Sequence, residues 1–232
     1  MTVIISVQGN IGSGKSTLVA KLKELLGSGR HRVCYLQEPV DEWETIKDSE
    51  GKTILELFYG DQGSYAFQFQ MMAYISRLAI LKRALNGNYD VIISERSLAT
   101  DKQVFCQMLY DNKKINDVEF QIYNKWFEEF QREFPVENIV YIQTDPTVAH
   151  ERVGRRARDG EAIPLEYLAN CHEYHERWIS SFPDSNVIVL DGNQDIRKNP
   201  EVLNEWEREI RNFVSRKAIV TSERGHNGHL SV

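Results

Sequence analysis

The chain has 232 residues, of which 41% are hydrophobic and 27% are charged, and its formal net charge is −6. This composition is typical of a folded globular domain and excludes a disordered chain. An acidic chain has no overall positive field with which to attract nucleic acid or an anionic membrane, so we expect neither as a partner. Cys34, Cys106 and Cys171 form no C-x-x-C motif. Three such cysteines predict free thiols in a cytoplasmic or nuclear protein.

Five short segments rich in β-branched residues predict strands. They are Val3–Val7, Arg32–Leu36, Val91–Ser94, Ile139–Ile142 and Val187–Leu190. Most are continuous apolar runs, which is typical of strands that are covered on both faces. Because a strand and a glycine-rich motif stand at the very N-terminus, we expect no signal or transit peptide. No apolar run approaches the ~18 residues of a membrane span.

Amphipathic segments alternate with these strands and predict helices. They are Lys15–Leu26, Asp61–Leu85, Asp101–Tyr110, Asp117–Glu133, Pro146–Arg158, Pro164–Ser181 and Pro200–Val214. The alternation predicts an α/β fold, a doubly wound parallel sheet of about five strands with helices on both faces. We expect one domain over residues 1–216 and a flexible tail over residues 217–232, because apolar periodicity is lost there.

The strongest motif follows the first predicted strand and opens the first predicted helix. Its residues satisfy G-x-x-x-x-G-K-[ST] and are Gly9, Asn10, Ile11, Gly12, Ser13, Gly14, Lys15, Ser16 and Thr17. In this context the backbone N–H groups of the loop cradle phosphate oxygens, the lysine contacts the β- and γ-phosphates, and Ser16 binds Mg²⁺. A glycine-rich turn with no ligand is the alternative, and the flanking strand and helix disfavour it.

A phosphate-binding loop indicates a nucleotide but not a reaction. Guanine-specific GTPases carry an N-K-x-D element, which Asn112–Ile115 does not complete, and no second domain suggests a mechanical ATPase. These observations favour a small-molecule kinase.

Carboxylates follow the second and third predicted strands. Glu38 and Glu95 lie where open α/β sheets place their ligands. A carboxylate at the first position can accept the proton of an attacking hydroxyl, and one at the second can serve a metal ion. Arg96 can steady Glu38 or the developing charge. A surface glutamate at position 38 and a structural Glu95–Arg96 pair are the alternatives.

Four arginines crowd the end of one predicted helix: Arg152, Arg155, Arg156 and Arg158. Arg152 and Arg156 are spaced i, i+4 and repel each other unless an anion lies between them. We therefore predict an arginine-rich lid that closes over the transferring phosphates. A solvated helix face is the alternative.

Taken together, these elements resemble the deoxynucleoside kinase family, in particular its deoxycytidine and deoxyguanosine kinase branch. The resemblance spans the chain from the first strand to about Phe213. It is carried by Gly9–Thr17, Glu38–Val40 with Trp43, Tyr59 with Phe69 and Gln70, Glu95–Ser97, Arg152–Arg158 and Ile163–Leu168.

The resemblance implies a role for each of these positions. Glu38 would be the general base for the sugar 5′-hydroxyl, oriented by Arg96, with Ser16 and Glu95 serving Mg²⁺. The implied nucleoside pocket comprises Glu38, Trp43, Tyr59, Phe69, Gln70, Ala73, Arg77, Arg96, Asp101, Phe105 and Glu161. The implied contacts to ATP or another triphosphate donor add Arg152, Arg156, Arg158, Asp195 and Ile196.

Base preference depends on two predicted helix faces. Gln70, Ala73 and Arg77 project from one side of the long helix, and Asp101 and Phe105 share a face of the next. An Arg77–Asp101 pair would crowd a thymine methyl group and offer polar contacts to an amino-bearing base. We therefore expect deoxyadenosine, deoxycytidine or deoxyguanosine to be preferred over thymidine. A purely structural ion pair is the alternative.

The predicted reaction is transfer of a γ-phosphoryl group to a deoxynucleoside 5′-hydroxyl in nucleotide salvage, with Lys15, Arg96 and Glu38 as the catalytic residues. A nucleoside monophosphate kinase and a non-catalytic nucleotide-binding switch remain alternatives. The resemblance also implies a homodimer.

Overall fold

The computed structural model describes residues 2–26, 31–134, 138–156 and 162–227. Its sheet has five strands in the order β2-β3-β1-β4-β5, and every neighbouring pair is parallel. The strands are β1 (Val3–Gly9), β2 (Val33–Leu36), β3 (Val91–Glu95), β4 (Asn138–Gln143) and β5 (Val187–Asp191). The predicted parallel sheet is confirmed, and each strand lies within two residues of its predicted bounds.

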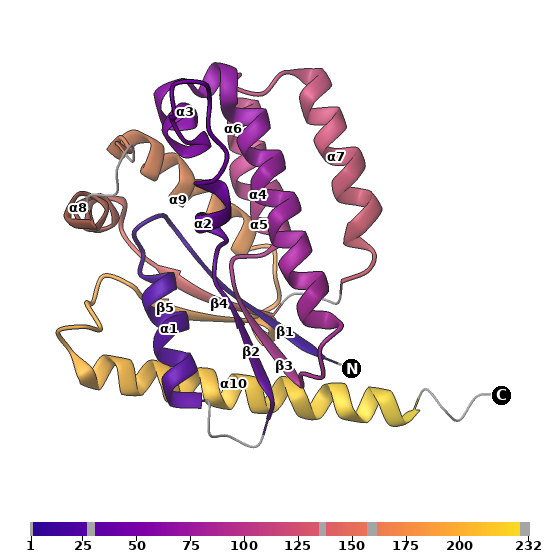
Figure 1. The fold of residues 1–232 in the computed structure, drawn as a ribbon. Helices are drawn as coiled ribbons and strands as arrows, with labels where there is room; N and C mark the ends of the chain where they lie inside the picture. The colour runs from indigo at the N-terminus through magenta and orange to yellow at the C-terminus, as the bar shows by residue number, and fades with distance from the viewer. Residues whose placement is uncertain (1, 27–30, 135–137, 157–161, 228–232) are drawn as a thin grey trace.

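Helices connect the strands and cover both faces of the sheet (Figure 1). They are α1 (Lys15–Leu26), α2 (Val40–Trp43), α3 (Ile54–Gly60), α4 (Gln62–Leu85), α5 (Leu98–Thr100), η1 (Asp101–Cys106), α6 (Gln107–Asp111), α7 (Asp117–Gln131), α8 (Pro146–Arg156), α9 (Leu165–Ile179), η2 (Asp184–Asn186) and α10 (Pro200–Asn227). Within the described ranges, no helix combines the length and the apolarity that a membrane span requires.

Alternating side chains of the strands build two separate cores. In β1, Val3, Ile5 and Val7 point toward α1 and α10 and pack with the alternating residues of β3 and β4. Ile4 of β1 and Ile92 of β3 point the other way, into the core formed with α4, η1, α7 and α9. Because both faces of each central strand are covered, these strands read as continuous apolar runs in the sequence.

The helix predicted over Asp101–Tyr110 contains a turn of π-helix, η1, between α5 and α6. Turns of this kind are rare and are frequently found at functional sites. Asp101 and Phe105 both lie in η1 and are both buried. The hydrophobic pattern cannot reveal the wider turn, because residues four apart share a face in either helix.

The C-terminal helix is longer than the sequence pattern predicts. We expected it to end at Val214, with irregular structure from residue 218, but α10 continues to Asn227. That part of the prediction is wrong. No proline follows Pro200, so nothing removes a backbone donor, and Arg216, Lys217 and Ala218 are strong helix formers.

Candidate active site

One cavity of about 530 Å³ opens at the carboxyl ends of the strands. Its lining includes residues that follow β1, β2, β3 and β5, together with residues from α4, η1, α8 and α9. Nearly all of the predicted site residues that the structure describes line it: Ile11, Gly12, Ser13, Gly14, Lys15, Ser16, Thr17, Glu38, Trp43, Tyr59, Phe69, Gln70, Ala73, Arg77, Glu95, Arg96, Asp101, Phe105, Arg152, Arg156, Asp195 and Ile196. Gly9, the last residue of β1, and Asn10 directly precede the part of the loop that lines the cavity. Arg158 and Glu161 lie outside the described residues.

The loop between β1 and α1 has the backbone that phosphate binding requires. Gly9 has φ 146°, and a side chain there would meet the carbonyl oxygen of Ile142 at 2.7 Å. Gly14 has φ 98°, a conformation that favours glycine. Lys15 Nζ donates to the carbonyl oxygen of Asn10 at 2.7 Å. Burial and then the charge of Arg96 lower the pKa of Lys15 to about 7. An anion bound in the loop would therefore favour the charged form of this lysine.

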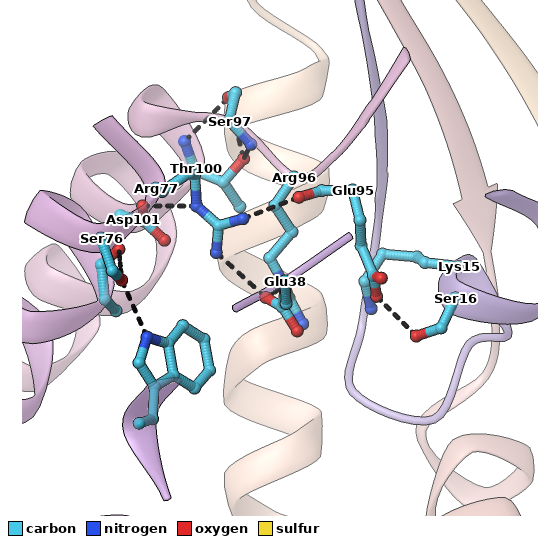
Figure 2. Close-up of polar contacts among 12 residues, drawn as sticks. Lys15, Ser16, Glu38, Ser76, Arg77, Glu95, Arg96, Ser97, Thr100 and Asp101 are labelled. Carbon is cyan, nitrogen blue, oxygen red and sulfur yellow. Dashed lines mark hydrogen bonds and ion pairs between the residues drawn. The ribbon is translucent and has the colours of Figure 1, made fainter. Parts of the chain in front are cut away.

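Ser16 and Glu95 come together as predicted. Ser16 Oγ, in the first turn of α1, donates to Glu95 Oε1 at the end of β3, at 2.7 Å (Figure 2). A hydroxyl and a carboxylate side by side beneath a phosphate-binding loop are oxygen ligands of the kind that Mg²⁺ takes. These two residues therefore fit a magnesium ion that also contacts phosphate.

Glu38 follows β2 and is held by two arginines. Its Oε1 accepts from Arg96 Nε at 2.8 Å and from Arg77 Nη2 at 3.0 Å. Burial raises the pKa of Glu38, but the positive charges of Arg96, Arg77 and Lys15 outweigh burial and lower it to about 2. Glu38 is therefore a fixed, ionised hydrogen-bond acceptor that is still one-fifth exposed to the cavity.

Arg77, on α4, connects three parts of the site (Figure 2). Besides Glu38, it donates from Nε to Asp101 Oδ2 at 2.8 Å and from Nη1 to the carbonyl oxygen of Glu95 at 2.7 Å. The predicted Arg77–Asp101 pair exists and lines the cavity. Its additional contact with Glu38 was not predicted, because nothing in the sequence indicates the distance between the second strand and α4.

Arg96 has an unusual backbone conformation. It has φ 62°, and its N–H donates to the carbonyl oxygen of Val7 at 2.9 Å. A non-glycine residue in the left-handed region costs roughly 1–2 kcal/mol, a cost often found at functional sites. The guanidinium lies 4.5 Å from the ring centre of Phe105. Nη1 is buried and, within the described residues, has no acceptor. Such a donor beside the phosphate-binding loop suits an anion.

Aromatic rings of α2, α4 and η1 line the far end of the cavity. Trp43 packs edge-on to Phe69 with ring centres 5.3 Å apart, and its Nε1 donates to Ser76 Oγ at 2.8 Å. Gln70 is buried, and none of the described residues donates to its Oε1. Flat apolar walls with one buried amide acceptor suit a flat heterocycle that carries a hydrogen-bond donor.

Arg152 of α8 contacts the phosphate-binding loop, where its Nη1 donates to the carbonyl oxygen of Ser13 at 3.5 Å, and it also contacts the loop after β5. Arg152 Nη1 donates to the carbonyl oxygen of Gly192 at 2.7 Å, and its Nη2 donates to those of Asn193 and Gln194 at 3.3 Å. Arg152 therefore holds the loop after β5. Both Arg152 and Arg156 line the cavity, so α8 presents positive charge to it. In the loop itself, Asp195 Oδ2 pairs with Arg197 Nη2 at 2.9 Å.

Tyr167 was missed as a site residue. It lies in the first turn of α9 and lines the cavity. An aromatic residue in the first turn of the helix that follows the arginine cluster could have indicated a site residue.

Comparison with known proteins agrees with this geometry. The deoxynucleoside kinase family model matches residues 5–215. A probable deoxycytidine kinase of fowlpox virus is 36% identical over 197 residues, which cover 82% of this chain and 78% of the viral protein. Human deoxycytidine kinase is 31% identical, with 89% and 90% covered. A mitochondrial deoxyguanosine kinase of Xenopus laevis is 28% identical, with 91% and 89% covered. The chain therefore belongs to the deoxynucleoside kinase family and is an enzyme that transfers a phosphoryl group from ATP to a deoxynucleoside.

Proposed function

We propose that this kinase phosphorylates deoxycytidine and purine deoxynucleosides in preference to thymidine, supplying 5′-monophosphates for nucleotide salvage. The observation that carries the preference is the buried Arg77–Asp101 pair beside Gln70. We infer that the pair would crowd the methyl group of a bound thymine. Gln70 Oε1 lacks a donor among the described residues, so it can accept from any of these bases and the preference rests on the pair. The relatives named above as deoxycytidine and deoxyguanosine kinases support the same preference.

Glu38 is the acceptor for the 5′-hydroxyl proton in this proposal. Its low pKa makes it a weak base, so it acts chiefly by orienting the hydroxyl and takes the proton late, as suits a loose phosphoryl-transfer transition state. Lys15, Arg96 and the arginines of α8 stabilise the charge on the transferring group. Ser16 and Glu95 would hold Mg²⁺, which neutralises phosphate charge when bound.

Glu38 also weighs against a nucleoside monophosphate kinase. That enzyme's acceptor is itself an anion and needs cations at this position. Here an ionised carboxylate faces the cavity, and it accepts from Arg77 Nη2 and Arg96 Nε. A non-catalytic switch would have no use for this arrangement.

The deciding measurement is kcat/KM for deoxycytidine, deoxyadenosine, deoxyguanosine and thymidine with Mg·ATP as donor. We expect at least one amino-bearing base to exceed thymidine by tenfold or more. Thymidine as the best substrate overturns the specificity proposal. Activity on deoxynucleoside monophosphates but on no deoxynucleoside overturns the role of Glu38.

A homodimer joined through α4 and α7 is a further part of the proposal. Ile75 of α4 and Val118, Ile122 and Trp126 of α7 are large apolar residues that are each more than 40% exposed. The two helices pack against each other through Tyr74 and Tyr123, with ring centres 5.5 Å apart. Such a surface on neighbouring helices suits a self-complementary interface.

We also propose a cytoplasmic location, consistent with three cysteines that form no disulfide.

A further inference from the structure

Asn10 occupies a position that the G-x-x-x-x-G-K-[ST] motif leaves open, yet it is among the most buried polar residues of the chain, with 2% exposed. The motif explains why glycine, lysine and serine occur around it. It gives no reason for an amide side chain to be buried at this position.

Both ends of the Asn10 amide are engaged. Nδ2 donates to the carbonyl oxygen of Leu168 at 2.8 Å, and Oδ1 accepts from the backbone N–H of Ile11 at 2.8 Å. Since the first partner is an acceptor and the second a donor, the orientation of the amide is fixed. Aspartate lacks the donor, and serine is too short to span both partners. Asparagine therefore joins the phosphate-binding loop to α9 through a contact that other short side chains cannot make.

The main chain of Asn10 holds the catalytic loop from the other side. Its carbonyl oxygen accepts from Lys15 Nζ at 2.7 Å and from the backbone N–H of Ser13 at 3.1 Å. One residue thus contacts the lysine that serves the phosphates and the helix that borders the acceptor pocket. A change in the position of Lys15 therefore acts directly on the backbone of Asn10, and the side chain of Asn10 is bonded to α9.

The helix reached by this contact supports the nucleoside pocket. Tyr167, next to Leu168, lines the cavity. One turn further on, Cys171 Sγ lies 3.7 Å from Met108 Sδ in α6. A turn after that, the ring of His175 packs edge-on to Phe105 with centres 6.0 Å apart. Phe105 is a wall of the base site, so α9 connects Asn10 to the residues around the nucleoside.

A second contact strengthens the same connection. Ile11 packs into a small apolar cluster formed by Ala149 and Val153 of α8 with Ile163 and Leu168. Asn10 and Ile11 therefore dock the loop onto both helices, one through a hydrogen bond and the other through apolar contact. Such packed elements move together rather than independently.

We propose that Asn10 is a positioning residue that couples the phosphate-binding loop to the deoxynucleoside pocket through α9, so that the nucleotide and the deoxynucleoside bind cooperatively. A bound polyphosphate draws Lys15 Nζ away from the Asn10 carbonyl, and the amide transmits the adjustment to Leu168. The proposal rests on the proposed function in placing the nucleoside in this cavity. Because coupling is reciprocal, each ligand changes the affinity of the other by the same factor.

Calorimetric titration of deoxycytidine, with and without saturating Mg·ADP, measures this coupling. We expect the wild-type Kd to differ by about fivefold or more between the two conditions, which is the lower end of typical coupling between sites. In Asn10→Ala the ratio of the two Kd values, without and with Mg·ADP, should fall toward one. Asn10→Ser, which removes the bond to Leu168 with a smaller loss of packing, should do the same and serves if the alanine variant does not fold.

The matched control is Asn138→Ala. Asn138 Nδ2 also donates to a backbone carbonyl, that of Ile4, at 3.0 Å, but at the opposite end of the sheet. This variant should lose similar stability and keep the wild-type factor. A wild-type factor of one, or an unchanged factor in both Asn10 variants, overturns the coupling while leaving the proposed function intact. If none of the four deoxynucleosides binds, the placement of the nucleoside fails, and the coupling proposal fails with it.

Discussion

The Nε atom of Arg77 donates to Asp101 Oδ2 at 2.8 Å, and only 2% and 3% of the two side chains are exposed. The same guanidinium holds Glu38 with its Nη2 atom. In the proposed function, the pair that selects the base and the carboxylate that meets the reacting hydroxyl are therefore joined through one side chain, that of Arg77. Changes made to alter base preference must also affect catalysis.

Removing one partner of this buried pair should destabilise the fold more than removing both. Asp101→Ala leaves Arg77 with a single carboxylate, and we expect the free energy of unfolding to fall by about 3 kcal/mol. Adding Arg77→Met should recover part of that loss, because an unbranched apolar chain needs no counter-charge. Urea denaturation of both single variants and the double variant measures the interaction. Strictly additive losses would show that the pair is not coupled.

The same double variant should change the base preference. Without the pair, space opens beside Gln70 and the polar contacts to an amino-bearing base are lost. We expect the ratio of kcat/KM for thymidine to that for deoxycytidine to rise at least tenfold, with a lower kcat for both because Glu38 loses one of its arginines. An unchanged ratio would mean that the pair is only structural.

Glu38→Gln should lower kcat by roughly 10²–10⁴-fold, the usual contribution of a positioned acid or base, with a smaller change in the KM for the nucleoside. Glutamine keeps the shape of the side chain and cannot take a proton. The exposed Glu42→Gln, four residues away in α2, is the control and should retain wild-type rates. Steady-state kinetics with deoxycytidine distinguishes the two variants. A raised KM with an unchanged kcat would make Glu38 a binding residue only.

Ionised Glu38 should stabilise the fold in a defined pH range. Its pKa is lowered from 4.5 to about 2 in the folded chain. The stabilisation is therefore fully present above about pH 4.5 and is lost as the pH falls toward 2. Denaturation of the wild type and of Glu38→Gln at pH 3 to 8 should show a constant difference above pH 5 that shrinks at lower pH. The pH profile of kcat/KM should show no acid limb from Glu38 between pH 5 and 8.

Nucleotide binding should take up a proton at mildly alkaline pH. Because the pKa of Lys15 is about 7, most of this lysine is neutral at pH 8, and a polyphosphate beside it favours the charged form. Calorimetry of Mg·ADP binding at pH 8 in two buffers with different ionisation enthalpies should show uptake approaching one proton. At pH 6 the lysine already carries its proton and uptake should be small. Equal uptake at both pH values would assign it to another group.

The dimer proposal predicts a change in mass. Trp126→Glu places a charge within the exposed apolar surface and should convert a particle of twice 26.9 kDa into one of 26.9 kDa. Glu128→Lys, on another face of α7, should leave the mass unchanged. Light scattering after gel filtration measures both variants. A wild-type protein that is already monomeric rules the proposal out.

The sequence predicted the sheet well, because strands buried on both faces appear as continuous apolar runs between amphipathic segments. It missed α2 and α3, although Thr53 and Glu56 form a capping box at the start of α3. Most of the residues that it predicted for the site line one cavity, since residues after parallel strands converge on one edge of the sheet. The partners of long side chains could not be predicted. Arg152, which was expected at the phosphates, contacts the carbonyl oxygen of Ser13 in the phosphate-binding loop and also donates to three backbone carbonyls of the loop after β5, which the sequence did not indicate.

The π-helical turn at η1 offers a way for a one-residue deletion to change the base preference of this enzyme. A π-turn holds one residue more than the α-helical turn it replaces, so deleting a single residue between Asp101 and Phe105 lets the segment return to α-helical bonding while α5 and α6 remain helical. Such a deletion rotates Asp101 against Phe105 and separates it from Arg77. A change in chain length, which most proteins tolerate only in loops, would here act inside a helix and reset the choice of base.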